Sequence, residues 1–286
     1  MIWRLVLGLY YVVSAPVAIF FIMHSASIHK AYKMTWFRRF KLGFHMFLNK
    51  LRIRTGTSYK SHLAMALKIL ESPPPDVMPG DIVECGTWKG GSAANLSLVC
   101  KIVGRKLRIF DSFEGLPEGV PGDREAKGYK QGDYCGQLEE VTNNIRRCGA
   151  LECCEFHKGW FEDTLPHLKS PVLLAFLDVD LEASLDTCVR HLWPDLVEKG
   201  YLFIDEYVGL DYCALFYSEK WWRKYFNRHP PGLIGAGTGL CLGEYYIGPY
   251  AERDAHPLQH PNAGAWTRKD FSGIWTFYSD ENIVEK

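Results

Sequence analysis

The first seventy residues contain no aspartate and no glutamate, and the first acidic residue of the chain is Glu71. Eleven of the 33 Lys and Arg residues lie in this acid-free part. The other 22 follow it together with all 33 Asp and Glu, so the rest of the chain carries a net charge of −11. A basic segment joined to an acidic body indicates an anionic surface as the partner of the segment.

Charge of either sign is missing from Leu5 to Met23, a run of nineteen residues. As a helix this run would span about 28 Å, close to the thickness of a bilayer core. The run therefore favours a membrane, and not nucleic acid, as the partner of the basic segment. We expect residues 1–26 to form a single-pass anchor. A helix packed on its own domain and a cleaved signal peptide are the alternatives.

Lysine and arginine gather after the apolar run rather than before it. Only Arg4 precedes the run, whereas five Lys and Arg lie between residues 30 and 41. The positive-inside rule then places the remainder of the chain in the cytoplasm. Residues 27–72 are predicted to be a basic, amphipathic helical segment, so that residues 1–54 would contact the membrane surface. Packing of this segment on its own domain is an equal alternative.

The nine cysteines form no Cys-x-x-Cys pair and are odd in number. This pattern argues against a zinc site or a disulfide framework and indicates reduced thiols. The chain also lacks the Walker A, Gly-x-Ser-x-Gly and His-Glu-x-x-His motifs, so P-loop, α/β-hydrolase and zinc-protease chemistry receive no support. His256 and His260 lie in a proline-rich stretch near the C-terminus, and the sequence assigns them no role.

After the prolines at 73–75, strand and helix patterns alternate. We expect strands at 81–85, 106–111, 154–157, 172–178 and 201–205, helices at 92–103, 137–148, 161–168, 183–197 and 212–226, and a terminal hairpin at 233–247. Such alternation predicts an α/β domain over residues 76–286, with a mostly parallel sheet and helices on both faces. Ligands bind at the carboxyl ends of the strands in sheets of this kind.

A glycine-rich turn follows the first predicted strand of this domain. Glu84, Gly86 and Gly90 form the pattern Glu-x-Gly-x-x-x-Gly, which is typical of S-adenosylmethionine (SAM) sites in Rossmann-like methyltransferases. A dinucleotide site would favour Gly-x-Gly-x-x-Gly instead. A carboxylate at the strand end suits the ammonium group of SAM. We expect the cofactor at this turn, including Thr87 and Ser92, the predicted helix N-cap; a turn without a ligand is the alternative.

The next two predicted strands end in residues that suit a nucleoside. Asp111 ends the second strand, where Rossmann-like folds place an acid on the ribose hydroxyls, and Ser112 follows it. Gly159 and Trp160 follow the third strand, where an aromatic ring can stack on a base. A turn-capping role for Asp111 and core packing for Trp160 are the alternatives.

Carboxylates also end the fourth and fifth predicted strands, at Asp178, Asp180, Asp205 and Glu206. Oxygen ligands at neighbouring strand ends suit Mg²⁺ or another divalent cation. Solvated loop acids are the bland alternative. Asp178-Val179-Asp180 also has the Asp-x-Asp form by which many glycosyltransferases hold a metal and a nucleotide sugar, so a metal-dependent glycosyltransferase is a rival reading.

Five ordered blocks between about residues 80 and 228 resemble the macrocin O-methyltransferase (TylF-like) family of SAM- and metal-dependent class I methyltransferases. The second block is the most specific. The blocks are Glu84-Cys-Gly-Thr-Trp-Lys-Gly-Gly-Ser92, Phe110-Asp-Ser-Phe-Glu-Gly-Leu-Pro117, Gly159-Trp-Phe-Glu-Asp-Thr-Leu-Pro166, Leu177-Asp-Val-Asp-Leu181 with Ser184, and Gly200-Tyr-Leu-Phe-Ile-Asp-Glu-Tyr207.

The resemblance implies a Rossmann-like sheet of seven strands, preceded here by the apolar and basic helical segment. It implies that Glu84, Gly86, Asp111 and Ser112 hold SAM and that Asp178, Asp205 and Glu206 hold Mg²⁺. Two blocks depart from the family. Asp-Asp-Tyr is usual where this chain has Asp205-Glu206-Tyr207, and Asp-Leu-Tyr-Glu-Ser is usual where it has Asp180-Leu-Glu-Ala-Ser184.

These observations predict a SAM-dependent, Mg²⁺-assisted O-methyltransferase acting on a hydroxyl of a sugar, glycoside or lipid-linked glycan. Asp178 is the expected general base, and the glycine-rich loop 113–136 is the expected lid. A catalytically degenerate, membrane-tethered module of the same fold is the non-enzymatic alternative. The sequence does not name the acceptor and leaves homo-oligomer formation open.

Overall fold

The computed structural model describes residues 2–118, 129–205, 210–235 and 264–270. Within them, strands in the order β3-β2-β1-β4-β5-β7-β6 form a seven-stranded sheet. Strands β1 to β5 are parallel, whereas β7 pairs antiparallel with both β5 and the two-residue β6. The strands are β1 (Asp81–Cys85), β2 (Leu107–Asp111), β3 (Cys154–Lys158), β4 (Val172–Leu177), β5 (Leu196–Ile204), β6 (Ile234–Gly235) and β7 (Ala265–Arg268).

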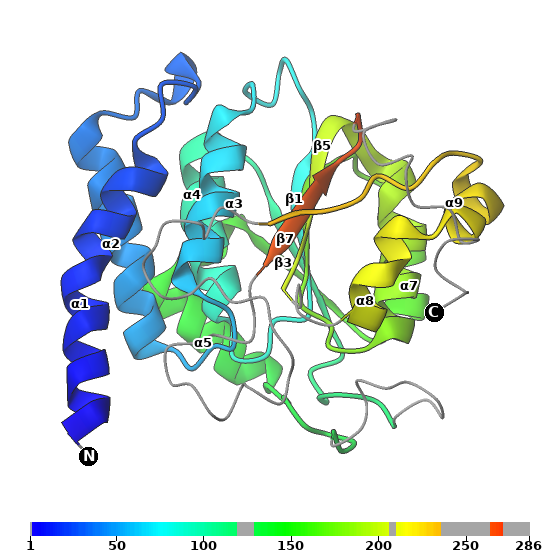
Figure 1. Cartoon of the computed structure of the whole chain (residues 1–286), viewed down its shortest axis with the longest axis horizontal. Helices are drawn as coiled ribbons and strands as arrows, with labels where there is room; N and C mark the ends of the chain where they lie inside the picture. Colours follow the sequence, from blue (N-terminus) through cyan, green and yellow to red (C-terminus); the bar gives the residue numbers. More distant parts are fainter. Residues whose placement is uncertain (1, 119–128, 206–209, 236–263, 271–286) are drawn as a thin grey trace.

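Helices cover both faces of the sheet (Figure 1). On one face lie α1 (Ile2–Met23), α2 (Trp36–Arg52), α3 (Tyr59–Glu71), α4 (Gly91–Val103) and α5 (Leu138–Cys148). On the other lie α6 (Phe161–Thr164), α7 (Glu182–Asp195), α8 (Leu210–Ala214) and α9 (Glu219–Phe226). The predicted α/β architecture is therefore confirmed.

The sheet separates two hydrophobic cores. Side chains alternate between the faces of a strand, so Ile82 of β1 joins the core under α3 and α4, whereas Val83 joins the core under α7. All six residues of β4 are buried, as expected for a central parallel strand covered on both sides. The two cores fix the strands and thereby the ends of the strands, where the candidate site lies.

The N-terminal helices belong to the first core. Ala15, Ala18 and Ile19 of α1 are fully buried, and Gly43 of α2 lies so close that an added Cβ would be 2.5 Å from Cγ2 of Ile19. The expected single-pass anchor is wrong: among the described residues, no helix is long and apolar enough to cross a membrane. The cytoplasmic placement depended on that span and falls with it. The domain boundary at residues 72–76 stays a prediction.

Several further elements differ from the sequence prediction, among them β5, which begins at Leu196 and not at residue 201. Helix α4 is capped by Gly90, with φ of +79°, and not by Ser92, which lies buried inside its first turn. The predicted helix 212–226 is divided, because Ser218 accepts from the backbone N–H of Trp221 and begins α9. The partner of β6 is β7, at residues 265–268, and most of the predicted hairpin 233–247 lies outside the described residues.

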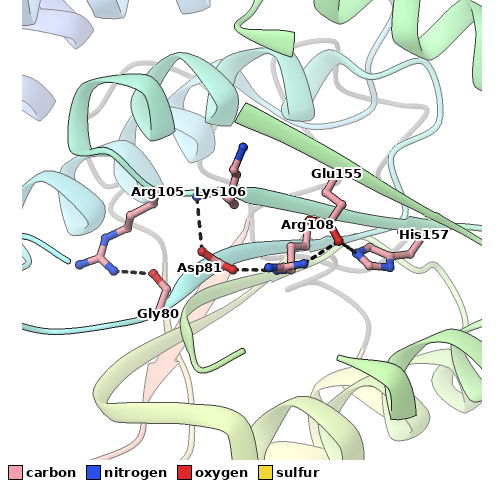
Figure 2. Close-up of polar contacts among 7 residues, drawn as sticks. All are labelled: Gly80, Asp81, Arg105, Lys106, Arg108, Glu155 and His157. Atoms are coloured by element: carbon pink, nitrogen blue, oxygen red, sulfur yellow. Dashed lines mark hydrogen bonds and ion pairs between the residues drawn. The ribbon is translucent and has the colours of Figure 1, made fainter. Parts of the chain in front are cut away.

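Ion pairs join β1, β2 and β3 on the α7 side of the sheet (Figure 2). Arg108 contacts Asp81 and Glu155 at 2.7 Å each, and Glu155 also lies 3.4 Å from His157. Arg105 donates to the backbone carbonyls of residues 73, 78 and 80, which ties the segment before β1 to the end of α4. Arg108 and Glu155 are register partners on β2 and β3, and none of these charged residues lines the cavity at the strand ends.

Candidate cofactor and acceptor site

A cavity of about 540 Å³ opens at the carboxyl ends of the parallel strands. The segments that follow β1, β2, β3 and β4 all contribute to its wall, which is the place predicted for a ligand in a doubly wound sheet. Its volume lies within the range of about 300–1,000 Å³ typical of small-molecule sites. The predicted site residues that line it are Gly86, Thr87, Asp111, Ser112, Gly159, Trp160, Asp178 and Asp180.

The remaining predicted residues lie elsewhere. Glu84 and Asp205 are fully buried, and neither lines the cavity. Gly90 and Ser92 belong to the start of α4, behind the turn. Glu206 lies outside the described residues, as do His256 and His260.

Gly86, directly after β1, packs closely on Asp178, directly after β4. Its φ is +79°, and a Cβ at this position would lie 1.9 Å from the carbonyl oxygen of Asp178. The two strand ends are also joined by a hydrogen bond of 3.0 Å from the Asp178 N–H to the carbonyl of Cys85. Only glycine fits this conformation and this approach, so the first glycine of the motif has a structural reason to be there.

Asp111 is held between two turns. Its Oδ2 accepts from the backbone N–H of Thr87 at 2.7 Å, and its Oδ1 accepts from the backbone N–H of Phe113, also at 2.7 Å. Burial raises the pKa of this carboxyl, while these N–H groups favour its charged form and oppose the rise. The carboxylate is therefore fixed in orientation at the cavity wall, as a ribose-binding acid would need to be.

Glu84 lies beneath the same turn. Its Oε2 accepts from the hydroxyl of Thr87 at 3.3 Å, and its Oε1 has no hydrogen bond to any described residue. Burial raises the pKa of Glu84 to about 8, although the hydroxyls of Ser92 and Thr87 oppose the rise. Glu84 is therefore a buried acid that supports the turn, placed behind the wall and not in it.

Asp178 is the predicted base, and it faces the cavity. Its Oδ2 accepts a hydrogen bond of 2.9 Å from the hydroxyl of Thr57. Burial raises its pKa to about 6, and the nearby Asp111 adds to the rise. The Thr57 hydroxyl and the positive charge of Lys50 act in the opposite direction. A carboxyl with this pKa is ionised at neutral pH and is still basic enough to take a proton.

Asp178 and Asp205 end neighbouring strands. Leu177 pairs with Ile204 in the β4–β5 register, and the Asp205 N–H donates to the carbonyl of Leu177 at 3.1 Å. The third expected ligand, Glu206, is outside the described residues. In the part of the chain that the structure describes, no three His, Cys, Asp or Glu side chains are placed to hold a metal ion. The Mg²⁺ site therefore stays a prediction.

Several residues at the cavity were missed by the sequence analysis. Gly56 lines it and Thr57 contacts Asp178, although both lie in the predicted basic, amphipathic helical segment 27–72. Trp88 and Tyr134 also line it, with ring centroids 5.4 Å apart. The aromatic residue inside a glycine-rich motif was an available signal for Trp88. No local signal marks Thr57, because its partner is 121 residues away.

The described parts of the predicted lid contact each other. The Leu116 N–H donates to the carbonyl of Asp133 at 2.8 Å, and the Gly132 N–H donates to the carbonyl of Leu116 at 2.9 Å. Gly115 is required there, because an added Cβ would lie 2.6 Å from two backbone oxygens. This paired segment forms one wall of the cavity. Opening and closing of the loop stays a prediction.

A mostly parallel α/β sheet with acidic strand ends around one cavity defines the Rossmann-like class I methyltransferase fold. Residues 60–227 match the family model described as "Macrocin-O-methyltransferase (TylF)", which is more than half of the chain. The chain belongs to this family. The resemblance seen in the five sequence blocks is thus confirmed, and the match disfavours the glycosyltransferase interpretation.

Two bacterial relatives illustrate the family. One, from Streptomyces olivaceus, is 8-demethyl-8-(2,3-dimethoxy-alpha-L-rhamnosyl)-tetracenomycin-C 4'-O-methyltransferase, 38% identical over 148 residues that cover 48% of this chain and 56% of that protein. The other, demethyldecarbamoylnovobiocin O-methyltransferase from Streptomyces niveus, is 32% identical over 146 residues, with the same coverage. The chain spans somewhat more than half the length of these relatives. Among solved structures, the O-methyltransferase NovP is 24% identical, with a TM-score of 0.48, over 68% of this chain and 73% of that one.

Proposed function

We propose that the protein is a SAM-dependent O-methyltransferase that transfers a methyl group to a hydroxyl of a sugar or glycoside. The observation that carries the proposal is the cavity at which Gly86, Asp111 and Asp178 meet, in a chain of the TylF family. Five carboxylates line its described wall, and Lys and Arg are absent from that described wall. This charge suits a ligand with a sulfonium and an ammonium group.

The acceptor class is proposed from the relatives. Their names describe methylation of a rhamnosyl tetracenomycin, of a novobiocin precursor and, in a third protein from Micromonospora griseorubida, of mycinamicin III. The names of these relatives and the size of the cavity both fit a small glycoside. The proposed acceptor is therefore a hydroxyl on the sugar of such a glycoside. The idea of a lipid-linked acceptor depended on the membrane anchor, and it is not proposed.

The proposed chemistry assigns one task to each of three residues at the cavity wall. Bound SAM supplies an activated methyl group, so the poor nucleophilicity of the acceptor hydroxyl is the remaining difficulty. Asp111 holds the nucleoside in place through ribose hydroxyls, and the turn at Gly86 leaves room for the amino-acid end. Asp178 takes the proton from the acceptor hydroxyl as its oxygen attacks. Holding that oxygen about 3–3.5 Å from the methyl carbon supplies much of the acceleration.

A divalent cation is a second part of the proposal. Asp178 and Asp205 at neighbouring strand ends, with Glu206 next in the chain, would hold Mg²⁺ and let it lower the pKa of the acceptor hydroxyl. Of these three residues, Asp178 and Asp205 lie among the described residues, and no step above depends on the ion. If it binds, EDTA should reduce methyl transfer by at least tenfold and Mg²⁺ should restore it. Full activity after metal removal would refute this part alone.

The function is tested by binding and transfer together. Calorimetry should detect SAM and S-adenosylhomocysteine, but not a uridine-diphosphate sugar. Tritium from [methyl-³H]SAM should then appear in at least one of three demethylated glycosides, namely the substrates named for the three relatives. Absence of SAM binding would overturn the proposal and favour the degenerate-module alternative. Binding without transfer would retain the cofactor site and reject this acceptor set.

A further inference from the structure

The connection between α2 and α3, residues 53–58, lies against the candidate site. Gly56 lines the cavity, and Thr57 is completely buried beside it. The hydroxyl of Thr57 donates to Oδ2 of Asp178 at 2.9 Å. This hydrogen bond joins the connection between two N-terminal helices to the proposed base. The connection also precedes residue 60, where the match to the family model begins.

The connection is held by contacts on several sides. Lys50 of α2 donates through Nζ to the carbonyl of Thr55 at 3.0 Å and to that of Thr57 at 2.9 Å. The Thr57 N–H donates to the hydroxyl of Thr55 at 3.3 Å. An added Cβ on Gly91 would lie 2.8 Å from Cβ of Thr55, so the connection packs directly on the start of α4. A hydroxyl on such a fixed backbone has little freedom to leave its partner.

The hydrogen bond from Thr57 fixes the orientation of the Asp178 carboxylate. One oxygen of its carboxylate is occupied by a strong, charge-assisted hydrogen bond, which fixes the plane of the group. The other oxygen is then the one that takes the proton of the acceptor hydroxyl. Loss of the bond would let the carboxylate rotate, and a displacement of about 1 Å is enough to cost a large factor in rate.

We propose that Thr57 is a positioning residue that orients Asp178 for the methyl-transfer step, so that the N-terminal helices complete the active site. The inference rests on the proposed function for its catalytic part. The contact itself can be tested without any acceptor. Thr57 does not touch the reacting atoms and acts through Asp178 alone.

The kinetic test compares two substitutions at one position. Thr57→Val keeps the shape of the side chain and removes the donor, whereas Thr57→Ser keeps the donor. With the glycoside accepted best of the three named above, Thr57→Val should lower kcat on the order of 10- to 100-fold, as expected for a hydrogen bond to a charged group. The Kd for SAM should stay within about twofold, and Thr57→Ser should retain most of the activity.

The matched control is Thr142→Val on α5. The Thr142 hydroxyl donates within its own helix to the carbonyl of Leu138 at 2.7 Å, away from the cavity. This variant loses the same kind of bond and should keep wild-type kcat. Wild-type kcat in Thr57→Val, or equal losses in Thr57→Val and Thr57→Ser, would overturn the positioning role.

A double-mutant cycle separates this inference from the proposed function. Urea midpoints are measured for the wild type, Thr57→Val, Asp178→Ala and the double variant, all without ligand. Coupled residues give a double variant whose shift differs from the sum of the single shifts. Additive shifts would overturn the contact even if the wild type transfers methyl groups. A wild type that transfers to no glycoside would instead reject the acceptor class, and the cycle would still decide on the contact.

Discussion

Asp178 combines a place at the cavity wall with a carboxyl that is ionised at neutral pH. If it is the base, Asp178→Asn should lower methyl transfer by at least about 100-fold, because the amide cannot accept the proton of the acceptor hydroxyl. SAM affinity should change little, since Asp111 and the Gly86 turn are untouched. Tritium transfer and calorimetry measure the two effects. The control is Asp76→Asn, at an exposed residue away from the cavity. Near-normal turnover in Asp178→Asn would show that Asp178 is not the general base.

Glu84 makes the stability of the free protein depend on pH. Burial raises its pKa from 4.5 to about 8, so the folded state holds the proton more tightly than the unfolded chain. Stability from this group is fully present below about pH 4.5 and is lost as the pH rises through about 8. Glu84→Gln should therefore have the higher thermal midpoint at pH 8, with a smaller difference at pH 5. The exposed Glu139→Gln should follow the wild type. Parallel curves for the Glu84 variant and the wild type would contradict the assignment.

At the scale of elements, the sequence predicts a strand or helix correctly where the hydrophobic pattern of that element is sufficient by itself. The continuous apolar run at β4 and the acid-ended strands β1 and β2 were predicted within about one residue. The division of α8 and α9 at Ser218 was missed, because amphipathic spacing continues across the break. The contact of Thr57 with Asp178 was missed because it depends on how α2 and α3 pack, which no local pattern reports.

Helix α1, wrongly predicted to be a membrane anchor, shows that local pattern does not report the packing partners of a whole helix. A charge-free run of nineteen residues favours a membrane span, but a buried helix can have the same composition. What distinguishes them is the partner, and here Ala15, Ala18 and Ile19 pack against α2 and α3. Gly43 was the available clue, because a glycine inside a helix can mark close packing against a neighbouring helix.

The α1–α2 contact can be tested directly. Gly43→Val places a branched side chain where Ile19 and Leu63 already lie, so one helix must shift. The free energy of unfolding should fall by about 1–3 kcal/mol, as for other overpacked cores. Urea denaturation measures it, with Val13→Thr on the exposed side of α1 as the control, expected within about 0.5 kcal/mol of the wild type. An unchanged Gly43→Val would mean that α1 does not pack on this domain.

At the scale of the whole molecule, the excess of acidic residues in the C-terminal part of the chain is also found at the cavity wall. The acidic residues lie after residue 70, and five of them, Asp111, Glu118, Glu162, Asp178 and Asp180, line the described wall of the cavity. Such a field attracts the positively charged cofactor and repels an anionic acceptor.

The acceptor selectivity of the proposed methyltransferase should follow from this field. For an accepted glycoside and its matched uronate, which differ only in a carboxylate, the KM of the uronate should be higher on the order of tenfold. The difference should shrink at about 0.5 M salt, because screening shortens the range of the wall's charges to a few ångströms. Glu118→Gln should also reduce this difference in KM, because it removes one negative charge from the cavity wall. Glu118 is assigned no part in the chemistry. An uronate that is methylated as well as its neutral partner at low salt would show that the acidic wall serves the cofactor alone and leaves acceptor choice to shape.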